Sequence, residues 1–415
     1  MKRKEKPRLE DLIPDETYRK ELKEGLYSGK RWLGPSGVFT ELLQSFVDAA
    51  LEGEMDHHLE QEHSTGKKNR RNGYGKKEVK TEGGTLSLNP PRDRSGSFEP
   101  TIVEKRSRSL KTGLDEVILS MYAKGNSVED IHRLLFEIYG VEYSNSAISL
   151  ITDRIWPDIV AWQQRPLRGC YAIVYMDGIH FRVKEDHQFV NKCVYTVYGI
   201  DCDGQRDILG IYTSENESAH IWGQILEDIS SRGVQDILIN CIDGLTGFKE
   251  SIEQVYPLAT VQRCIVHKIR NSVRFVPDKN KKKICADLRT IYGSATESQA
   301  SQALESFKIK WGKEGERIAK LWENDWSELM AFMEFGTHIR RMIYTTNPVE
   351  AVHRIIRKVT KSKGAWISEK SLLKQLYLTL MNQQKSWNRK AFHWKAIQLE
   401  LLDKFGERYG QWVSQ

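Results

Sequence analysis

Cysteine is scarce in this sequence, since six residues in 415 are too few for a disulfide framework. Several of the six lie inside apolar runs, as small buried side chains do in reduced compartments. Long apolar runs are also missing, and none approaches the length that a helix needs to span a bilayer. Residues Met1 to Arg8 are charged and no apolar stretch follows them, so we expect no secretory signal. We therefore expect a cytoplasmic protein without a membrane partner.

A strong charge of one sign is missing as well, because the formal net charge is only +7. The charge is unevenly spread: Lys67 to Lys111 contains 13 Lys and Arg against 5 Asp and Glu, and this excess exceeds the net charge of the whole chain. Such a segment attracts polyanions, of which DNA is the commonest large one in a cell. Charge alone is equally consistent with a solvated basic linker. The cations that we predict to contact DNA here are Lys67, Lys68, Arg70 and Arg71.

The first part of the chain is predicted to contain helices and one small hairpin. Apolar residues at helical spacing predict a helix over 38–62. Alternating segments at 78–81 and 85–88 predict two strands joined by a Gly83-Gly84 turn. Three more helical patterns follow between 113 and 160, and Ser127 and Ser144 are suited to cap the second and the third.

Those last three helices are typical of a helix-turn-helix module, whose final helix can enter the major groove. We expect its exposed polar residues to meet bases and phosphates: Asn145, Ser146, Ser149, Thr152 and Arg154. Among them, Asn145, Ser149 and Arg154 are the predicted DNA-binding residues. A three-helix bundle that only packs has the same pattern, but the basic stretch before it favours DNA binding.

From residue 170 the pattern changes to strands. Apolar runs predict strands at 170–176, 193–200, 207–213, 234–242 and 259–262, with helices at 218–231 and 247–255. This order is that of a ribonuclease H-like α/β fold, an antiparallel meander extended by parallel strands through helical crossovers. Residues 268–337 have a helical pattern and are interpreted as an all-α insertion before the fold resumes near Tyr344.

Two aspartates follow predicted central strands. Asp177 comes directly after the first strand and Asp243 directly after the fourth, so both are expected at one edge of the sheet, where sites form. An Asp before a Gly is also common in ordinary turns. Carboxylates that converge from separate elements can hold two cations roughly 4 Å apart for phosphodiester chemistry. Mg²⁺, with Mn²⁺ as a substitute, is the metal that such ligands prefer.

A third acid, Glu350, lies near the start of a predicted helix. Asn347 is suited to cap this helix and Pro348 to its first position, so Glu350 can be explained as part of a capping box or as a partner of Arg354. The rest of the helix favours a metal ligand beside DNA, because it has one apolar side and one basic side. The basic side, predicted to bind DNA, consists of Arg354, Arg357, Lys358 and Lys361.

These residues occur in motifs that resemble those of the Mutator-type bacterial insertion-sequence transposases. The most specific motif runs through Asp243, Gly247-Phe248, Val255-Tyr256-Pro257, Ala259, Gln262, Cys264 and His267. Further blocks are Tyr344-Thr345-Thr346-Asn347 before Glu350, Arg71-Asn72-Gly73-Tyr74, and residues 91–100. The resemblance covers roughly residues 35 to 380. It departs at Gly364-Ala365-Trp366-Ile367, where the family's motif has a Phe-Pro pair.

The resemblance implies that Asp177, Asp243 and Glu350 form an Asp-Asp-Glu triad that binds two metal ions and catalyses DNA transposition. It implies as partners the terminal inverted repeats of the element and the target, both double-stranded DNA. We also expect a homodimer or higher homo-oligomer that holds two ends together. The expected segments are an N-terminal helical region (1–66), a basic segment (67–112), a helix-turn-helix domain (113–165), a catalytic core (168–267 and 340–365), an insertion (268–339) and a C-terminal helical tail (366–415).

Cys264 and His267 form half of a zinc site, and zinc requires four ligands. Other Cys and His residues lack a second pair with suitable spacing, so we do not expect structural zinc. Instead we expect His267 and Asn347 to support the active site and Cys264 to pack inside. The insertion tryptophans Trp311, Trp322 and Trp326 are more typical of a core than of base stacking.

Two other classes fit parts of the pattern. A non-catalytic DNA-binding regulator would use only the helix-turn-helix and would not need the three acids. A ribonuclease H-like nuclease or resolvase would hydrolyse DNA without joining it, but the N-terminal DNA-reading module favours an enzyme that recognises particular ends.

Overall fold

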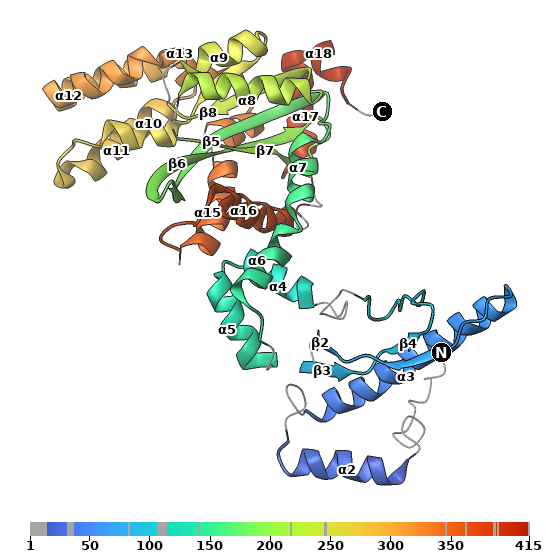
Figure 1. Cartoon of the computed structure of the whole chain (residues 1–415). Coiled ribbons are helices and arrows are strands. Elements are labelled where there is room, and N and C mark those ends of the chain that lie inside the picture. Colours follow the sequence, from blue (N-terminus) through green and yellow to red (C-terminus); the bar gives the residue numbers. More distant parts are fainter. Residues whose placement is uncertain are drawn as a thin grey trace, which may run out of the picture. The chain divides into compact units, whose positions relative to one another are not determined.

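The computed structural model describes the chain except residues 1–14, 31–36, 82–83, 106–113, 140–141, 216–217, 245–246, 345–346, 362, 385–386, 388–389 and 414–415. The chain divides into two compact units, Met1–Arg154 and Ile155–Gln415, and we describe each by itself (Figure 1). Of the residues described, no helix has both the length and the apolar character that crossing a bilayer requires.

The N-terminal unit combines a long helix with two short antiparallel strand pairs. Its first elements are α2 (Glu16–Tyr27), α3 (Val38–Ser64), β1 (Arg71–Tyr74), β2 (Lys77–Thr81), β3 (Gly84–Leu88) and β4 (Pro91–Asp93). The predicted hairpin is confirmed as the pair β2–β3, although Gly83 of its predicted turn lies outside the described residues. The pair β1–β4 was not predicted, because its strands are short and lack an alternating apolar pattern.

The predicted helix over 38–62 is confirmed as α3, which packs along β3 and β4 (Figure 1). Its buried apolar side is narrow and consists of Val47, Leu51 and Met55, which lie four residues apart. Phe46 falls beside this stripe and is 71% exposed. The small core beneath the helix is completed by apolar residues of the β2–β3 hairpin.

A buried polar cluster joins α3 to β4. Its carboxylates are Glu62 of α3 and Asp93 of β4, and the Asn69 amide lies between them, with its Nδ2 2.5 Å from Glu62 Oε2 and 2.7 Å from Asp93 Oδ2. The hydroxyls of Ser95 and Ser97 and the amide N–H groups of Ser97 and Phe98 also donate to Asp93. Because buried carboxylates are stable when their oxygens accept such bonds, this cluster fastens the helix to the strand.

The unit ends in the three predicted helices, α4 (Leu114–Ala123), α5 (Val128–Tyr139) and α6 (Asn145–Asp153). The predicted caps are confirmed: Ser127 and Asp130 exchange hydrogen bonds at the start of α5, and the Ser144 hydroxyl accepts one from the Ala147 N–H. The prediction that Thr152 is exposed was wrong. Thr152 is fully buried, because it shares one side of α6 with Ile148 and Ile151, and this helix packs against α4 and α5.

The second unit is built on a five-stranded mixed sheet. Its strands are β5 (Cys170–Glu185), β6 (Gln188–Asp201), β7 (Arg206–Ser214), β8 (Asp236–Ile242) and β9 (Thr260–Arg263), with α8 (Ala219–Ser231) and α9 (Phe248–Val255) between the later ones. The spatial order is β7-β6-β5-β8-β9; β5, β6 and β7 are antiparallel neighbours, whereas β8 is parallel to β5 and β9 to β8. This is the predicted strand order.

One strand boundary was wrong in a way that concerns the site. Strand β5 continues to Glu185 and forms a long hairpin with β6, so Asp177 lies inside the strand instead of after it. Its second half alternates buried Ile179, Phe181 and Val183 with exposed or half-buried polar residues. Such alternation is typical of a strand with one covered face, whereas the prediction relied on the continuous apolar run alone.

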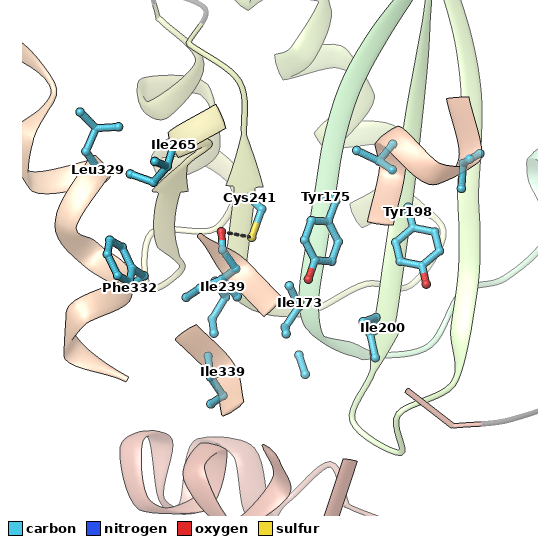
Figure 2. Packing of buried hydrophobic residues seen from close by; sticks show 14 of the residues in the cluster. Ile173, Tyr175, Tyr198, Ile200, Ile239, Cys241, Ile265, Leu329, Phe332 and Ile339 are labelled. Carbon is cyan, nitrogen blue, oxygen red and sulfur yellow. Dashed lines mark hydrogen bonds between the residues drawn. The ribbon is translucent and has the colours of Figure 1, made fainter. Parts of the chain in front are cut away.

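Helices cover both faces of this sheet. On one face, α8 and α9 bury a cluster that includes Tyr195, Trp222 and Phe248, with the two last rings stacked 4.3 Å apart between centroids. On the other face, residues of β5, β6 and β8 pack against residues of later helices (Figure 2). There the Cys241 Sγ lies 3.7 Å from the Ile343 carbonyl oxygen, which it contacts as a donor (Figure 2).

The segment after β9 is helical, as predicted. It consists of α10 (Ile265–Ser272), α11 (Asp278–Tyr292), α12 (Glu297–Asn324), α13 (Trp326–Met330), η1 (Ala331–Glu334) and α14 (Thr337–Ile343). Trp322 is fully buried and donates to the Ser272 hydroxyl, and Trp311 donates to Asp287. These two side chains therefore serve the packing of the segment.

The remaining helices of this unit are α7 (Trp156–Gln164), α15 (Asn347–Thr360), α16 (Glu369–Gln384), α17 (Trp394–Phe405) and α18 (Glu407–Gly410). The last two pack onto the sheet end: Arg408 binds both carboxylate oxygens of Asp236, and Trp394 covers Gly204. Gly204 has a φ of +85°, and a Cβ there would lie 2.4 Å from the Trp394 ring. Packing within the unit therefore accounts for Trp394, Ile397 and Leu401 of the C-terminal tail, which are buried.

Candidate active site

Asp177 is a buried acid near the middle of the central strand β5. It is 7% exposed, and across the strand pair it lies opposite Thr196 of β6. Its Oδ1 accepts a hydrogen bond of 2.9 Å from the Gly178 N–H, and its Oδ2 lies 3.4 Å from Nδ1 of His353. A buried carboxylate on a central strand, in contact with a buried imidazole, is a candidate for a functional site.

Asp243 occupies the matching position on the neighbouring strand. In the parallel pair β5–β8, Tyr175 is opposite Cys241, and each acid follows two residues later in its own strand direction. Asp243 comes directly after β8, as predicted, and is half-buried. Because side chains alternate along a strand, Asp177 lies on the same sheet face as Tyr175, the face that carries the cluster of Figure 2.

Glu350 is brought to this region by α15, which packs on β5 and β6. The buried side of the helix is formed by Val349, Val352 and Ile356. The Glu350 carboxylate faces α10: its Oε1 lies 2.9 Å from Nη1 of Arg270 and 3.3 Å from Nε2 of His267. The outer side of α15 carries the exposed cations Arg354, Arg357 and Lys358, and Lys361, also exposed, directly follows the helix, as the sequence predicts.

His353 is a residue of this region for which sequence reasoning assigned no role in the site. It is 2% exposed and lies between Asp177 and Thr196, with its Nε2 3.3 Å from the Thr196 hydroxyl. It follows Glu350 by three residues, so the two side chains project from adjacent positions on α15. This spacing is the sequence feature that could have predicted His353 as a neighbour of Glu350.

These residues line a small pocket of about 230 Å³. Its lining consists of Asp177, Gly178, His267, Arg270, Glu350, His353, Arg354 and Arg357. The structure therefore brings together two of the three predicted acids with His267 and two of the predicted cations. Asp243 lies outside this lining.

The pocket has the donor types that a divalent cation needs, because Asp177 and Glu350 offer carboxylate oxygens. Arg270 and His267 both contact Oε1 of Glu350, and each oxygen of this carboxylate is a potential metal ligand. Elsewhere, His58, Glu62 and Asp93 form the one group in the described parts of the chain whose ligand atoms all lie within 4.8 Å of one another. In that group the carboxylates already accept several N–H and O–H bonds.

The predicted N-terminal DNA contacts have different surroundings. Arg71 forms ion pairs with Asp56, 2.5 Å away, and with Glu52, and these hydrogen bonds raise its pKa above the usual range. Lys67 lies 3.3 Å from Glu62, whereas Lys68 and Arg70 are exposed.

In the three-helix segment, Asn145 donates to Glu129 over 2.8 Å and Arg154 lies 2.5 Å from Asp115, while Ser149 is half-buried. Of the other predicted support residues, Cys264 is buried at the start of α10, where its N–H donates to the Ile242 carbonyl. The Asn347 side chain lies outside what the structure describes.

A mixed sheet with one acid on a central strand, a second directly after the adjacent parallel strand and a third on a docked basic helix is suited to an enzyme that acts on nucleic acid. Comparison with known proteins agrees, since the family model described as "Transposase, Mutator family" matches residues 18–390. The chain belongs to this family of transposases, enzymes that cut and join DNA. Such activity distinguishes it from a regulator that only binds DNA and from a nuclease that only hydrolyses it.

The relatives carry insertion-sequence names. The chain is 36% identical over 395 residues to the transposase for insertion sequence element ISRM3 of Rhizobium meliloti (strain 1021), covering 94% of this chain and 98% of that protein. It is equally similar, with the same coverage, to a probable transposase for an ISRM3-like element of Sinorhizobium fredii. Among solved structures, a Drosophila P element transposase strand transfer complex matches 70% of this chain and 85% of that chain, with 9% identity and a TM-score of 0.27, too low to establish a shared fold.

Proposed function

We propose that this chain binds the ends of an insertion sequence and catalyses metal-dependent strand cleavage and strand transfer with Asp177, Asp243 and Glu350. The observation that carries the proposal is the register of β5 and β8, which sets Asp177 and Asp243 at matching positions on adjacent parallel strands. The strand order also supports a ribonuclease H-like core, in which the acids lie on the central strands.

The proposed cofactor is Mg²⁺, with Mn²⁺ as a substitute, and two ions per site. When bound, such ions activate a water or a 3′-hydroxyl and stabilise the leaving oxygen. Asp177 and Asp243 supply oxygens from the sheet, and Glu350 supplies them from α15. Arg270 and His267 hold the Glu350 carboxylate toward the pocket until it takes up that role.

The cations beside the acids have a separate role in this proposal. Arg354 and Arg357 line the pocket and are exposed, so they are accessible to phosphates of the scissile strand. Lys358 and Lys361 continue the same exposed side of α15. They orient the DNA backbone, whereas the three acids act on one phosphate.

His353 is proposed as a positioning residue. Its two ring nitrogens reach Asp177 on β5 and Thr196 on β6, and its backbone belongs to the helix that carries Glu350. A single buried side chain therefore connects the two acids that share the pocket. It orients Asp177 and fixes where α15 lies on the sheet, as outer-shell partners of metal ligands do.

The remaining parts of the sequence prediction extend this proposal. The three helices α4 to α6 would read the element ends through Asn145, Ser149 and Arg154, and residues 268–339 would form the family's insertion. A homodimer that holds two ends is proposed from the need to cut both ends of one element. In the tail, Leu372, Leu376 and Leu401 are buried within the unit, whereas Phe392, Leu399 and Leu402 are exposed.

The proposal is tested with purified protein, labelled terminal DNA and Mg²⁺. We expect Asp177→Asn, Asp243→Asn and Glu350→Gln each to lower cleavage and strand transfer on the order of a thousandfold, because several kcal/mol of metal-dependent stabilisation is lost. Binding to the ends should change little. The matched controls are Asp403→Asn and Glu316→Gln, which neutralise exposed acids of the same unit. A Glu350→Gln variant as active as its control would contradict the proposal and favour the helix-capping role.

A further inference from the structure

The N-terminal unit contains a large cleft with many cations in its wall. Its volume is about 1290 Å³, and it opens between the strand pairs β1–β4 and β2–β3 and the segment that follows them. The cations that line it are Lys76, Lys77, Lys80, Arg92 and Lys105. None of these five cations is among the predicted DNA-binding residues, and those predicted in this basic segment lie earlier in it.

Three of these lysines donate to main-chain carbonyl oxygens. Lys77 donates to the carbonyl oxygens of Glu104 and Lys105, Lys80 to that of Glu142, and Lys105 to that of Gly96, over 3.0 Å. A carbonyl group is neutral, so these bonds position the ammonium groups without cancelling their charge. Burial lowers the pKa of Lys77 despite the nearby Glu104, which agrees with a poorly compensated cation.

Arg92 is positioned by the backbone beneath it. Gly75 is buried, and a Cβ built there would lie 3.0 Å from Nη2 of Arg92, so the guanidinium lies against the glycine. The Gly75 N–H also donates to the Pro90 carbonyl, which fixes the two chain segments side by side. Arg92 itself is exposed, and its donors are therefore available to a ligand in the cleft.

The carboxylates of the cleft do not balance these cations. Its acidic lining residues are Glu78, Asp93 and Glu142, fewer than the cations. The charge of Asp93 is already stabilised by the donors of the cluster at α3. By contrast, Arg71 and Lys67, just outside the cleft, are paired with carboxylates of α3.

We propose that this cleft binds the phosphate backbone of double-stranded DNA, through Lys76, Lys80, Arg92 and Lys105. Among the described residues, none of these four cations forms an ion pair with a carboxylate. Pre-positioned cations of this kind gain the most from a polyanion, because no ion pair must be broken first. Backbone contacts carry no sequence information, so the cleft holds any duplex and leaves the reading of bases to another element. This inference rests on the proposed function, in which the chain binds element DNA.

The test measures binding of the full chain to fluorescent duplexes over a range of salt concentrations. The cleft variant is Lys76→Gln/Lys80→Gln/Lys105→Gln, in which the Gln residues at 80 and 105 keep a donor for the carbonyl groups that the lysines contact. The matched control is Lys30→Gln/Lys281→Gln/Lys310→Gln, which removes the same charge from lysines that are paired with acids. Each phosphate contact contributes about 0.9 to the steepness of the plot of log binding constant against log salt concentration. Loss of three contacts should therefore make this slope shallower by up to about 2.7. Its affinity near physiological salt should fall on the order of a hundredfold, equally for end DNA and unrelated DNA.

Equal salt slopes for the cleft variant and the control would overturn the inference. Thermal unfolding checks that the cleft variant is folded, and Lys76→Glu gives a second measurement, because Lys76 is exposed and its reversal breaks none of the carbonyl bonds. That single variant should also lower the slope. Failure of the proposed function is distinguishable, since the wild type would then neither bind end DNA nor cut it, whereas failure of the inference leaves both intact.

Discussion

The two units each contain a group of acids, and the groups differ in what satisfies their oxygens. In the N-terminal unit, Glu62 and Asp93 share the Asn69 amide and accept further bonds from serine hydroxyls and backbone N–H groups. In the second unit, Asp177 accepts a hydrogen bond from the neighbouring Gly178 N–H. Glu350 contacts the side chains of His267 and Arg270.

The difference shows that closeness of ligand atoms is a poor guide to a metal site. His58, Glu62 and Asp93 lie closer together than the three catalytic candidates, yet hydrogen-bond donors already occupy their oxygens. Metal ligands need lone pairs that the protein has not used. We therefore propose a structural role for Glu62 and Asp93, and the catalytic role remains a proposal for Asp177, Asp243 and Glu350.

The largest effect expected in the first group is a loss of stability. Asp93→Asn removes the charge that several donors stabilise, and hydrogen bonds to a charged group contribute about 1.5–3 kcal/mol each. We expect the free energy of local opening of α3 and β4 to fall by about 3 kcal/mol, while cleavage per folded molecule stays unchanged. Hydrogen exchange of the full chain measures this, with Glu60→Gln on the exposed side of α3 as the control.

The same variant has a defined dependence on pH. Burial alone would raise the pKa of the Asp93 carboxyl, but the donors of Asn69, Ser95, Phe98 and Ser97 outweigh it and hold the pKa well below its usual range. A depressed pKa contributes stability above the ordinary carboxyl pKa of about 4, and this contribution is lost as pH falls toward the folded-state pKa. The difference in opening free energy between wild type and Asp93→Asn should therefore be constant near neutral pH and become smaller in acid. A gap that widens in acid would contradict the structural role.

A smaller effect is expected at His353, and it concerns rate instead of stability. His353→Ala should lower the cleavage rate about 10–100-fold and raise the Mg²⁺ concentration needed for half-maximal rate, because Asp177 loses its orienting partner. His353→Asn keeps an N–H donor near the ring Nδ1 position and should recover much of the loss. The control is His220→Ala, an exposed histidine of α8. A purely structural role for His353 would leave the Mg²⁺ requirement unchanged and move only the melting temperature.

The sequence predicted much of the fold and only part of the site. The strand order, the caps at Ser127 and Ser144 and the basic side of α15 follow from local patterns and are present in the structure. The position of Asp177 inside β5 was missed, because polar residues interrupt the apolar run that marks the strand. The contact of His353 with Asp177 depends on how α15 docks on the sheet, and no local pattern encodes such docking.

Mapping of the bound metal tests the central assignment most directly. When Fe²⁺ replaces Mg²⁺ in the complex with terminal DNA, ascorbate and peroxide produce radicals that cut the polypeptide close to the ion. We predict cuts near residues 177, 243 and 350, suppressed by excess Mg²⁺ and by Glu350→Gln. Cuts confined to the surroundings of His58, Glu62 and Asp93 would contradict this assignment and would indicate that the metal binds in the N-terminal unit.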